Sequence, residues 1–398
     1  MFAVPWSLMF SRRTDWTLTP NRFSQVQREL SSADREVLDL TVSNPVRAGL
    51  HYDADAILDS LKNPKAMDYD PQPKGLHSAR EAVAAYYREQ HQSLVDPDSL
   101  VLTTSTSEGY SHVFRLLCNP DDEILVPKPS YPLFEFLADL QDVKLVPYPL
   151  LYDHGWQIDF PSLSRTVTPR TRAVVVVHPN NPTGSYVSSG ERTQLNSFCR
   201  EHGLVLIVDE VFLDYPRDGV TRPSFVVNPD VLTFTLSGLS KISGLPQMKL
   251  AWIATSGPAP AAIAAMDRLE VIADTYLSMN APIQLAATVL LEQRKNIQPI
   301  LIDRLRVNLA QLDDQLKGQK STQRLQVDGG WYAVLRVPVT RTDENLAIAL
   351  LHQASVLVHP GHFYDFPNDG YLIVSLLTRP EEFCEGISQI LQFLNQES

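Results

Sequence analysis

Cysteine is scarce in this chain of 398 residues. Its three cysteines, Cys118, Cys199 and Cys384, are odd in number, stand far apart and form no CxxC pair. Disulfide scaffolds and structural zinc sites both depend on closely patterned cysteine or histidine ligands. The sequence therefore predicts reduced thiols, with neither a disulfide framework nor a metal site.

Long apolar runs are also missing. No segment approaches the ~20 consecutive apolar residues that a transmembrane helix needs. The apolar start, residues 1–10, is short, and Arg12 and Arg13 follow it, which is the reverse of the order in a secretion signal. We therefore predict a cytoplasmic protein that has no membrane partner.

Positive charge is in short supply as well. The chain has 34 lysines and arginines against 46 acidic residues, for a net charge of −12. No dense basic cluster offsets this balance locally, so the electrostatic footprint of a nucleic-acid-binding protein is absent. Small-molecule chemistry fits the composition better.

The chain is long enough for two domains around separate cores. Short apolar, β-branched runs alternate with helical patterns through its middle, which is typical of an α/β protein with a largely parallel sheet. The runs are residues 123–126, 173–177, 204–208, 231–236 and 250–254. A long helix is expected from Pro282 to about Lys317, followed by a strand at 330–335. We predict a large domain at 46–290 and a smaller one formed by 1–45 together with 291–398.

Several of these runs end in polar or glycine- and proline-rich segments. In open α/β sheets, ligands bind outside the carboxyl ends of the strands. The run from Thr233 closes on Ser240-Lys241, and a lysine at the end of a rigid strand suits a Schiff base with a carbonyl cofactor. A surface lysine is the alternative interpretation of this position. Residues 102–108 indicate a strand entering a helix rich in capping hydroxyls, and such a helix start can bind a phosphate or only cap itself.

The segment Gly238-Leu-Ser-Lys241-Ile-Ser-Gly244-Leu245 resembles the lysine signature of class I aminotransferases. Four other segments follow that family's order, including His178-Pro-Asn-Asn181-Pro-Thr-Gly184 and Val208-Asp209-Glu210. The resemblance spans roughly residues 41–374. It implies a pyridoxal 5'-phosphate (PLP) enzyme of fold type I, α/β, with a mostly parallel seven-stranded sheet in the large domain and a smaller α/β domain. It also implies a homodimer with active sites at the interface.

The resemblance implies a role for each matching residue. Lys241 would carry the cofactor, and Asp209 would pair with its pyridine nitrogen. Asn181, with a cis bond to Pro182, would donate to its phenolic oxygen. Tyr131 would stack on the pyridine ring. The phosphate would be bound by five residues: Ser105, Thr106, Ser107, Lys249 and, from the partner subunit, Tyr69.

The chain departs from the family pattern at specific positions. Lys249 replaces an arginine at the phosphate, and Gln247 replaces a small residue, asparagine or arginine. Phe212 occupies the cofactor-binding position of a tyrosine, so one donor to the phenolic oxygen is missing. Ile373 occupies the position of the arginine that binds the substrate carboxylate, and Arg379 or Arg336 is the predicted substitute.

These observations predict an aminotransferase that acts on an amino acid and a 2-oxo acid. One alternative is a PLP-dependent carbon–sulfur or β-elimination lyase, because the same scaffold and cofactor contacts serve both reactions. The other is a non-catalytic PLP-binding effector domain, although no basic helix-turn-helix segment precedes the fold.

Overall fold

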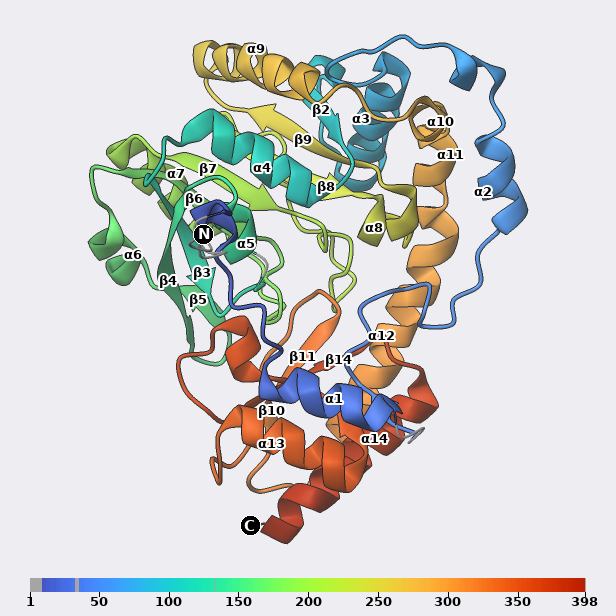
Figure 1. Ribbon diagram of the computed structural model, residues 1–398, viewed down its shortest axis with the longest axis vertical. Helices are drawn as coiled ribbons and strands as arrows, with labels where there is room; N and C mark the ends of the chain where they lie inside the picture. Colours follow the sequence, from blue (N-terminus) through green and yellow to red (C-terminus); the bar gives the residue numbers. More distant parts are fainter. Residues whose placement is uncertain (1–8, 33–35, 133, 398) are drawn as a thin grey trace, which may run out of the picture.

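The computed structural model describes residues 9–32, 36–132 and 134–397. Figure 1 shows a larger lobe built on a wide sheet and a smaller lobe that contains the C-terminus. The long helix α12 (Arg294–Leu316) runs from the first lobe into the second. None of the described helices is long and apolar enough to cross a membrane.

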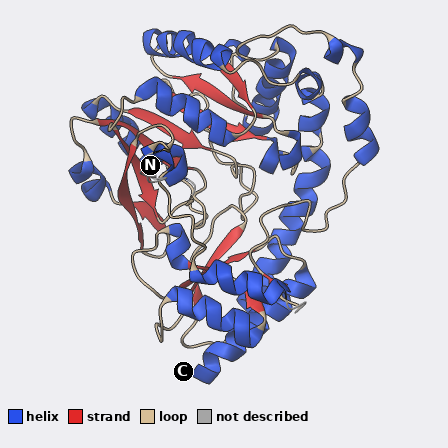
Figure 2. Ribbon diagram, in the orientation of Figure 1, coloured by secondary structure: helices blue, strands red, loops and turns tan. Residues whose placement is uncertain are grey.

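An eight-stranded sheet forms the centre of the larger lobe (Figure 2). Its strands, in spatial order, are β2 (Leu100–Thr103), β9 (Ala251–Ser256), β8 (Thr233–Gly238), β7 (Val205–Asp209), β6 (Thr171–Val177), β3 (Glu123–Lys128), β4 (Lys144–Tyr152) and β5 (Trp156–Ile158). Seven strands were expected, and the eighth is the short edge strand β5, which pairs antiparallel with β4. The mostly parallel α/β architecture is confirmed.

The predicted strand runs are present with small shifts of their ends. Of the five predicted strand runs, the last, β9, does not pair parallel with its neighbours. It is antiparallel to both β2 and β8. A parallel partner would require a crossover to the opposite edge of the sheet. Residues 239–250 instead remain at the edge where β8 ends, so the chain enters β9 in the reverse direction.

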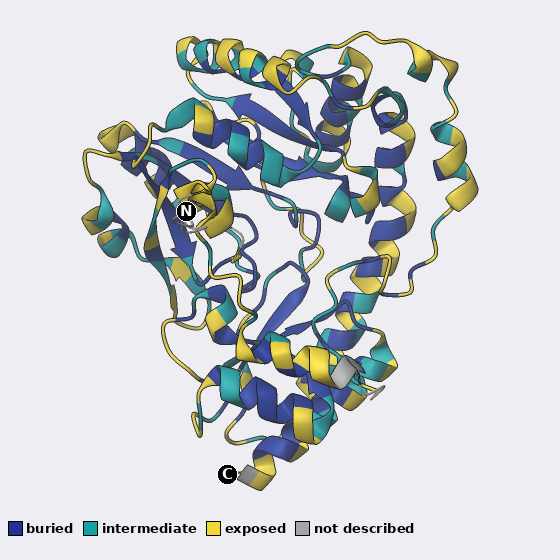
Figure 3. Cartoon of the chain, in the orientation of Figure 1, coloured by how far each residue is buried: buried dark blue, intermediate teal, exposed yellow. Residues whose placement is uncertain are grey.

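Helices cover both faces of this sheet, whose central strands are buried (Figure 3). One face packs against α4 (Thr106–Leu117), α5 (Phe134–Asp139) and α9 (Ala259–Thr275). The other face packs against α6 (Phe160–Thr166) and α7 (Ser189–His202). Alternate valines of β6 enter the two cores, as the period of two in a strand requires.

A further core lies beside β2 and β9. It is formed by α2 (Ala54–Ser60), α3 (His77–His91), α8 (Leu239–Ile242), α10 (Ala281–Leu285) and α11 (Ala287–Glu292). The helix predicted from Pro282 to Lys317 is therefore present as three consecutive helices. The chain breaks their continuity at Ala286 and Gln293, which serve as helix caps.

The smaller lobe has a sheet in the order β10 (Gln323–Arg324), β11 (Tyr332–Arg336), β14 (Tyr371–Ser375) and β13 (His359–Pro360). A separate pair joins β1 (Leu38–Asp39) to β12 (Val356–Leu357). The helices of this lobe are α1 (Arg22–Ser32), α13 (Asp343–Ala349) and α14 (Pro380–Glu397), with the π-helical turn η6 (Leu350–Ala354). Five 3-10 turns complete the described elements: η2 (Arg12–Thr14), η3 (Pro64–Met67), η4 (Pro97–Ser99), η5 (Pro246–Met248) and η7 (Gly361–Tyr364).

The N-terminal segment joins the core of the smaller lobe. Phe23 and Val26 of α1 are buried in the same cluster as residues of β11, β14 and α14. Upstream of α1, however, Trp16 donates a hydrogen bond to Asp139 of α5 in the larger lobe, at 2.8 Å. The domain limits at residues 45 and 290 agree with most of this packing and stay a prediction.

Candidate active site

A cavity of about 240 Å³ lies at the carboxyl edge of the large sheet. Its walls come from the ends of β6, β7 and β8, the start of α4, the segment after β3, and the smaller lobe. Seven residues that the sequence singled out line it: Thr106, Ser107, Tyr131, Asn181, Asp209, Phe212 and Lys241. The position agrees with the rule that open α/β sheets bind ligands outside the carboxyl ends of their strands.

Lys241 enters this cavity from α8, the single helical turn that follows β8. Its Nζ lies 3.4 Å from the carbonyl oxygen of Ser43 and 4.7 Å above the ring centroid of Trp331. Burial disfavours the charged ammonium and lowers the lysine pKa to about 8, while the charge of Asp209 acts in the opposite direction. A substantial fraction of this amine is therefore neutral, and so nucleophilic, near physiological pH.

Asp209 is the last residue of β7 and is almost completely buried. The Tyr110 hydroxyl donates to Oδ2 at 3.1 Å, and the backbone N–H of Val211 donates to Oδ1 at 3.1 Å. Burial nevertheless raises the carboxyl pKa to about 6. A buried carboxylate of this kind gains most from a cationic partner such as a protonated ring nitrogen.

Asn181 follows β6 and is joined to Pro182 by a cis peptide bond, as the resemblance predicted. The side chain is buried, and its Oδ1 has no hydrogen-bond partner among the described residues. Buried polar atoms are normally paired, so an unpaired one in a cavity wall favours a bound polar group. The residues present therefore fit a polar cofactor that contacts Asn181 and Asp209 together.

The start of α4 provides the predicted anion site. Ser105 caps this helix, because its Oγ accepts a hydrogen bond from the backbone N–H of Glu108 at 3.2 Å. The Ser105 side chain is thus used for capping, whereas Thr106 and Ser107 face the cavity. A helix start presents free amides and the positive end of the helix dipole to an anion.

Lys249 lies outside the cavity walls and is exposed. It stands two residues before β9, whose first residue, Ala251, pairs with Thr103 and with Gly238. This register places the Lys249 backbone at the same sheet edge as the start of α4 and as Ser240, which lines the cavity. The role of Lys249 at a phosphate stays a prediction.

Tyr131 and Phe212 both line the cavity. Phe212 packs edge-on against Trp331, with ring centroids 5.2 Å apart, and its ring centroid lies 5.4 Å from Lys241 Nζ. Tyr69, in contrast, is 79% exposed and lies away from the cavity in its own chain. Such exposure is compatible with the predicted contact to a partner subunit.

The two predicted substrate arginines do not reach the cavity walls. Arg336 is exposed at the end of β11, and Arg379 is exposed near Glu382, with 3.8 Å between the charged atoms. Ile373 is buried in β14, two residues from Ser375, which pairs with Tyr332. Because alternate strand residues share a face, Ile373 lies on the same face as the cavity-lining Tyr332.

Sequence reasoning missed three residues of the site. Ser43 and Tyr332 line the cavity, and Tyr110 supports Asp209 from α4. Tyr332 lies on a predicted strand, but alternation alone does not show which face meets the other lobe. Tyr110 lies four residues after Thr106, and this helical spacing is the signal that could have placed both on one face.

An open α/β sheet with a partly buried lysine, a buried carboxylate and a predicted anion-binding helix start at one edge is typical of a cofactor-dependent group-transfer enzyme. The profile of the family "Aminotransferase class I and II" matches residues 35–383. The chain belongs to this family and is an aminotransferase. The family uses PLP as its cofactor.

Named relatives cover nearly the whole chain. The glutamate-pyruvate aminotransferase AlaA of Escherichia coli is 27% identical over 376 residues, which is 92% of this chain and 93% of that protein. An alanine aminotransferase of Mycobacterium bovis is 28% identical over 375 residues, 92% of this chain and 87% of that protein.

Solved structures show the same fold. The structure of an Escherichia coli aminotransferase superposes with a TM-score of 0.85 at 25% identity, covering 97% of this chain and 98% of the other. An alanine aminotransferase from Pyrococcus furiosus gives a TM-score of 0.86 at 23% identity, covering 97% and 100% of the two chains. The expected aspartate-aminotransferase-like fold is confirmed.

Proposed function

We propose that this protein binds PLP covalently through Lys241 and transfers an amino group between an amino acid and a 2-oxo acid. The observation that carries the proposal is the convergence of Lys241, Asp209 and Asn181 on one cavity. These side chains come from three separate segments of the sequence. A lysine of lowered pKa beside a buried, partly paired carboxylate is costly to maintain unless it serves a reaction.

Each residue has a distinct task in the proposed reaction. When bound, the cofactor supplies an electron sink for the negative charge that develops on the substrate carbon. Asp209 stabilises a protonated pyridine nitrogen, and Asn181 orients the ring through its amide. Thr106 and Ser107, at the start of α4, bind the phosphate. Once displaced by the substrate, the Lys241 amine would take the proton from the substrate Cα and deliver it to the C4' carbon of the cofactor.

We further propose that the enzyme works as a homodimer in the cytoplasm, with Tyr69 of each subunit reaching the phosphate of the other. The exposure of Tyr69 and its distance from the cavity of its own chain support this arrangement. Sedimentation and PLP binding of the Tyr69→Phe variant would test the dimer and the phosphate contact separately. We expect an intact dimer that binds PLP more weakly.

The proposed chemistry is tested by trapping the lysine. Borohydride reduction of the PLP-loaded enzyme, followed by peptide mapping, should place the pyridoxyl group on Lys241. Lys241→Ala should lose the label and the amino-transfer activity, while Lys249→Ala should retain the label. A label on Lys249 would overturn the assignment.

The substrates are tested separately. Amino acids should convert bound PLP to its amine form, and product should accumulate only when a 2-oxo acid is added. Release of pyruvate without an acceptor would instead indicate an elimination lyase. Lack of conversion by any amino acid would favour a binding role without catalysis.

A further inference from the structure

The short helix that carries Lys241 is held by side chains from outside the active-site cavity. Helix α8 has a single turn, so its last carbonyl groups lack partners within the helix. Tyr215 Oη donates to the carbonyl oxygen of Lys241 at 2.5 Å, and Gln298 Nε2 donates to that of Ile242 at 2.9 Å. Two side chains thus bind the backbone at and directly beside the reactive lysine.

Gln298 also connects α8 to a buried carboxylate. The same Nε2 donates to Asp214 Oδ2 at 2.6 Å. Asp214 lies directly before Tyr215, so both anchors of α8 depend on one turn of the chain. This turn begins at Asp209, the carboxylate of the cavity. Any shift of the turn would therefore move the lysine helix and the Asp209 region together.

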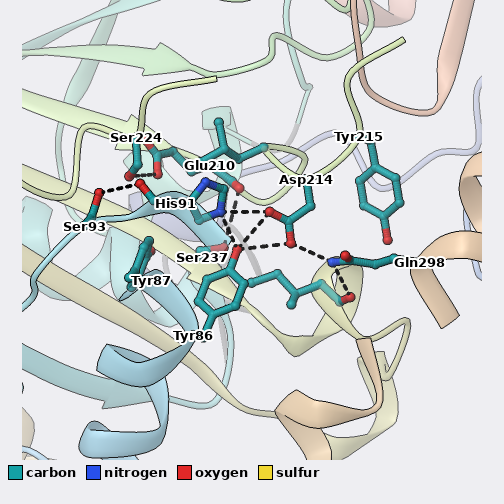
Figure 4. A network of polar contacts seen from close by, with 12 residues as sticks. Tyr86, Tyr87, His91, Ser93, Glu210, Asp214, Tyr215, Ser224, Ser237 and Gln298 are labelled. Carbon is teal, nitrogen blue, oxygen red and sulfur yellow. Dashed lines mark hydrogen bonds and ion pairs between the residues drawn. The ribbon is translucent and has the colours of Figure 1, made fainter. Parts of the chain in front are cut away.

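Asp214 is in turn held by groups from α3 (Figure 4). His91 Nε2 lies 2.9 Å from Asp214 Oδ1, and both side chains are only 1% exposed. Tyr86 Oη lies 3.1 Å from each carboxylate oxygen of Asp214 and 3.0 Å from His91 Nε2. A carboxylate this deeply buried costs free energy unless several donors satisfy it, and a paired, fully satisfied one fixes the geometry around it.

The first part of the turn is fixed in a similar way. Glu210 accepts hydrogen bonds from Ser224 Oγ and from the backbone N–H of Phe225, both at 2.6 Å. The backbone N–H groups of Leu213 and Tyr215 bond to the carbonyl groups of Glu210 and Phe212. The turn is therefore restrained at both ends, and Asp214 is the point where α3 and α12 meet it.

We propose that His91, Asp214 and Gln298 form a positioning unit that, together with Tyr215, fixes α8 and so aims the Lys241 amine at the cofactor. This inference rests on the proposed function, because it assumes that Lys241 is the reactive lysine. None of His91, Asp214, Tyr215 or Gln298 is among the residues that line the active-site cavity. Their effect on catalysis must pass through the α8 backbone.

The test compares two glutamines. Gln298→Met keeps the side-chain volume but removes the two hydrogen bonds that Gln298 donates, to Asp214 and to Ile242. Gln284→Met is the matched control, because Gln284 is also buried and bridges backbone groups, accepting from Leu76 and donating to Met279. Within the described part of the chain, the hydrogen bonds of Gln284 do not involve α8. Tyr215→Phe is the second test variant, because it removes only the hydrogen bond to the Lys241 carbonyl and keeps the ring beside Trp331.

The main measurement uses the cofactor-free protein. The pH dependence of Lys241 labelling by a small amine-reactive reagent, mapped by mass spectrometry, reports the state of the amine. A loosened α8 admits water, so the labelling midpoint should rise by about half a pH unit or more in Gln298→Met and Tyr215→Phe. In the loaded enzyme, kcat should fall about fivefold or more with little change in KM. Gln284→Met should change neither quantity.

His91 is tested by chemical rescue. A second cavity, of about 580 Å³, is lined by His91, Asp214 and Tyr215 on the side away from the active site. His91→Ala should raise the Lys241 midpoint, and added imidazole should restore it. A wild-type midpoint and kcat in Gln298→Met and Tyr215→Phe would overturn the proposal, as would equal effects in Gln284→Met.

The remaining outcomes also decide the question. If His91→Ala folds but imidazole does not restore the midpoint, His91 has no positioning role and the proposed unit is overturned. Failure of the proposed function looks different, because borohydride would then label another residue while the midpoint shifts at Lys241 could still occur.

Discussion

Tyr110 donates a hydrogen bond to Asp209 across the interface between α4 and the end of β7, with 3.1 Å between the oxygens. Both side chains are buried. The helix whose first turn forms the predicted phosphate site therefore also supports the carboxylate predicted to pair with the pyridine ring. The predicted phosphate site and the predicted ring contact are thus connected through a single helix, α4.

As the pH rises, cofactor-free Asp209→Asn should become more stable relative to the wild-type protein at the same pH. The folded-state pKa of Asp209, about 6, lies above its ordinary value of 3.8, so the folded state holds the proton more tightly. The free energy of unfolding contributed by Asp209 is thus highest below pH 4 and falls as the pH rises to 6. Urea unfolding measures the free energy of unfolding of both proteins. Between pH 4 and 7.5, the difference between them should shift by about 2–3 kcal/mol in favour of the variant. A gain that is independent of pH would contradict this account.

Tyr110→Phe should raise the Asp209 pKa above about 6. The hydroxyl stabilises the ionised carboxylate, and its hydrogen bond is one of the causes that lower the pKa against burial. Carboxyl-carbon NMR of the cofactor-free protein can follow this titration, and the spectrum of Asp209→Asn identifies the signal. An unchanged or lower pKa would show that Tyr110 acts only by packing.

Asp209→Asn should also lower the pKa of Lys241. The carboxylate charge of Asp209 raises the lysine pKa, while burial lowers it to about 8. Without that charge only the effect of burial remains, so the labelling midpoint of Lys241 should fall below 8. Lys241 labelling in Gln284→Met serves as the control, because Gln284 forms its hydrogen bonds with Leu76 and Met279.

Phe212→Tyr should restore a donor near the cofactor's phenolic oxygen. The Phe212 ring lies in the cavity wall with its centroid 5.4 Å from Lys241 Nζ. A donor there stabilises negative charge on that oxygen, so the pH at which the bound cofactor changes its visible absorption should fall. A spectral titration with no shift, or with a rise, would show that the ring is not directed at this oxygen.

Arg379→Ala and Arg336→Ala test how the substrate carboxylate is bound. A relocated arginine that binds the substrate carboxylate is worth about tenfold or more in kcat/KM. Both arginines are exposed and lie outside the cavity walls, so the structure favours changes within about twofold. A tenfold loss in either variant, with an unchanged cofactor spectrum, would restore the relocated-arginine hypothesis.

The local order of the site could be predicted from sequence because strand ends and helix starts are short-range features. Lys241, Asp209 and Asn181 each follow an apolar strand, and the carboxyl ends of parallel strands meet at one edge. The antiparallel direction of β9 and the edge strand β5 were not predictable in the same way, since a period of two is identical in both directions.

By itself, the sequence determined the α/β class, the strand runs and the ordered motifs that resemble aminotransferases, because hydrophobic periodicity and turn residues act over a few positions. Tertiary packing brings Ser43 and Tyr332 into the cavity, places Tyr110 against Asp209, and leaves Arg336 and Arg379 outside the cavity walls. The same packing brings His91 to Asp214, 123 positions away along the chain. Such contacts depend on how helices and lobes pack, and burial of a charged or polar side chain is set by that packing and not by its neighbours in sequence.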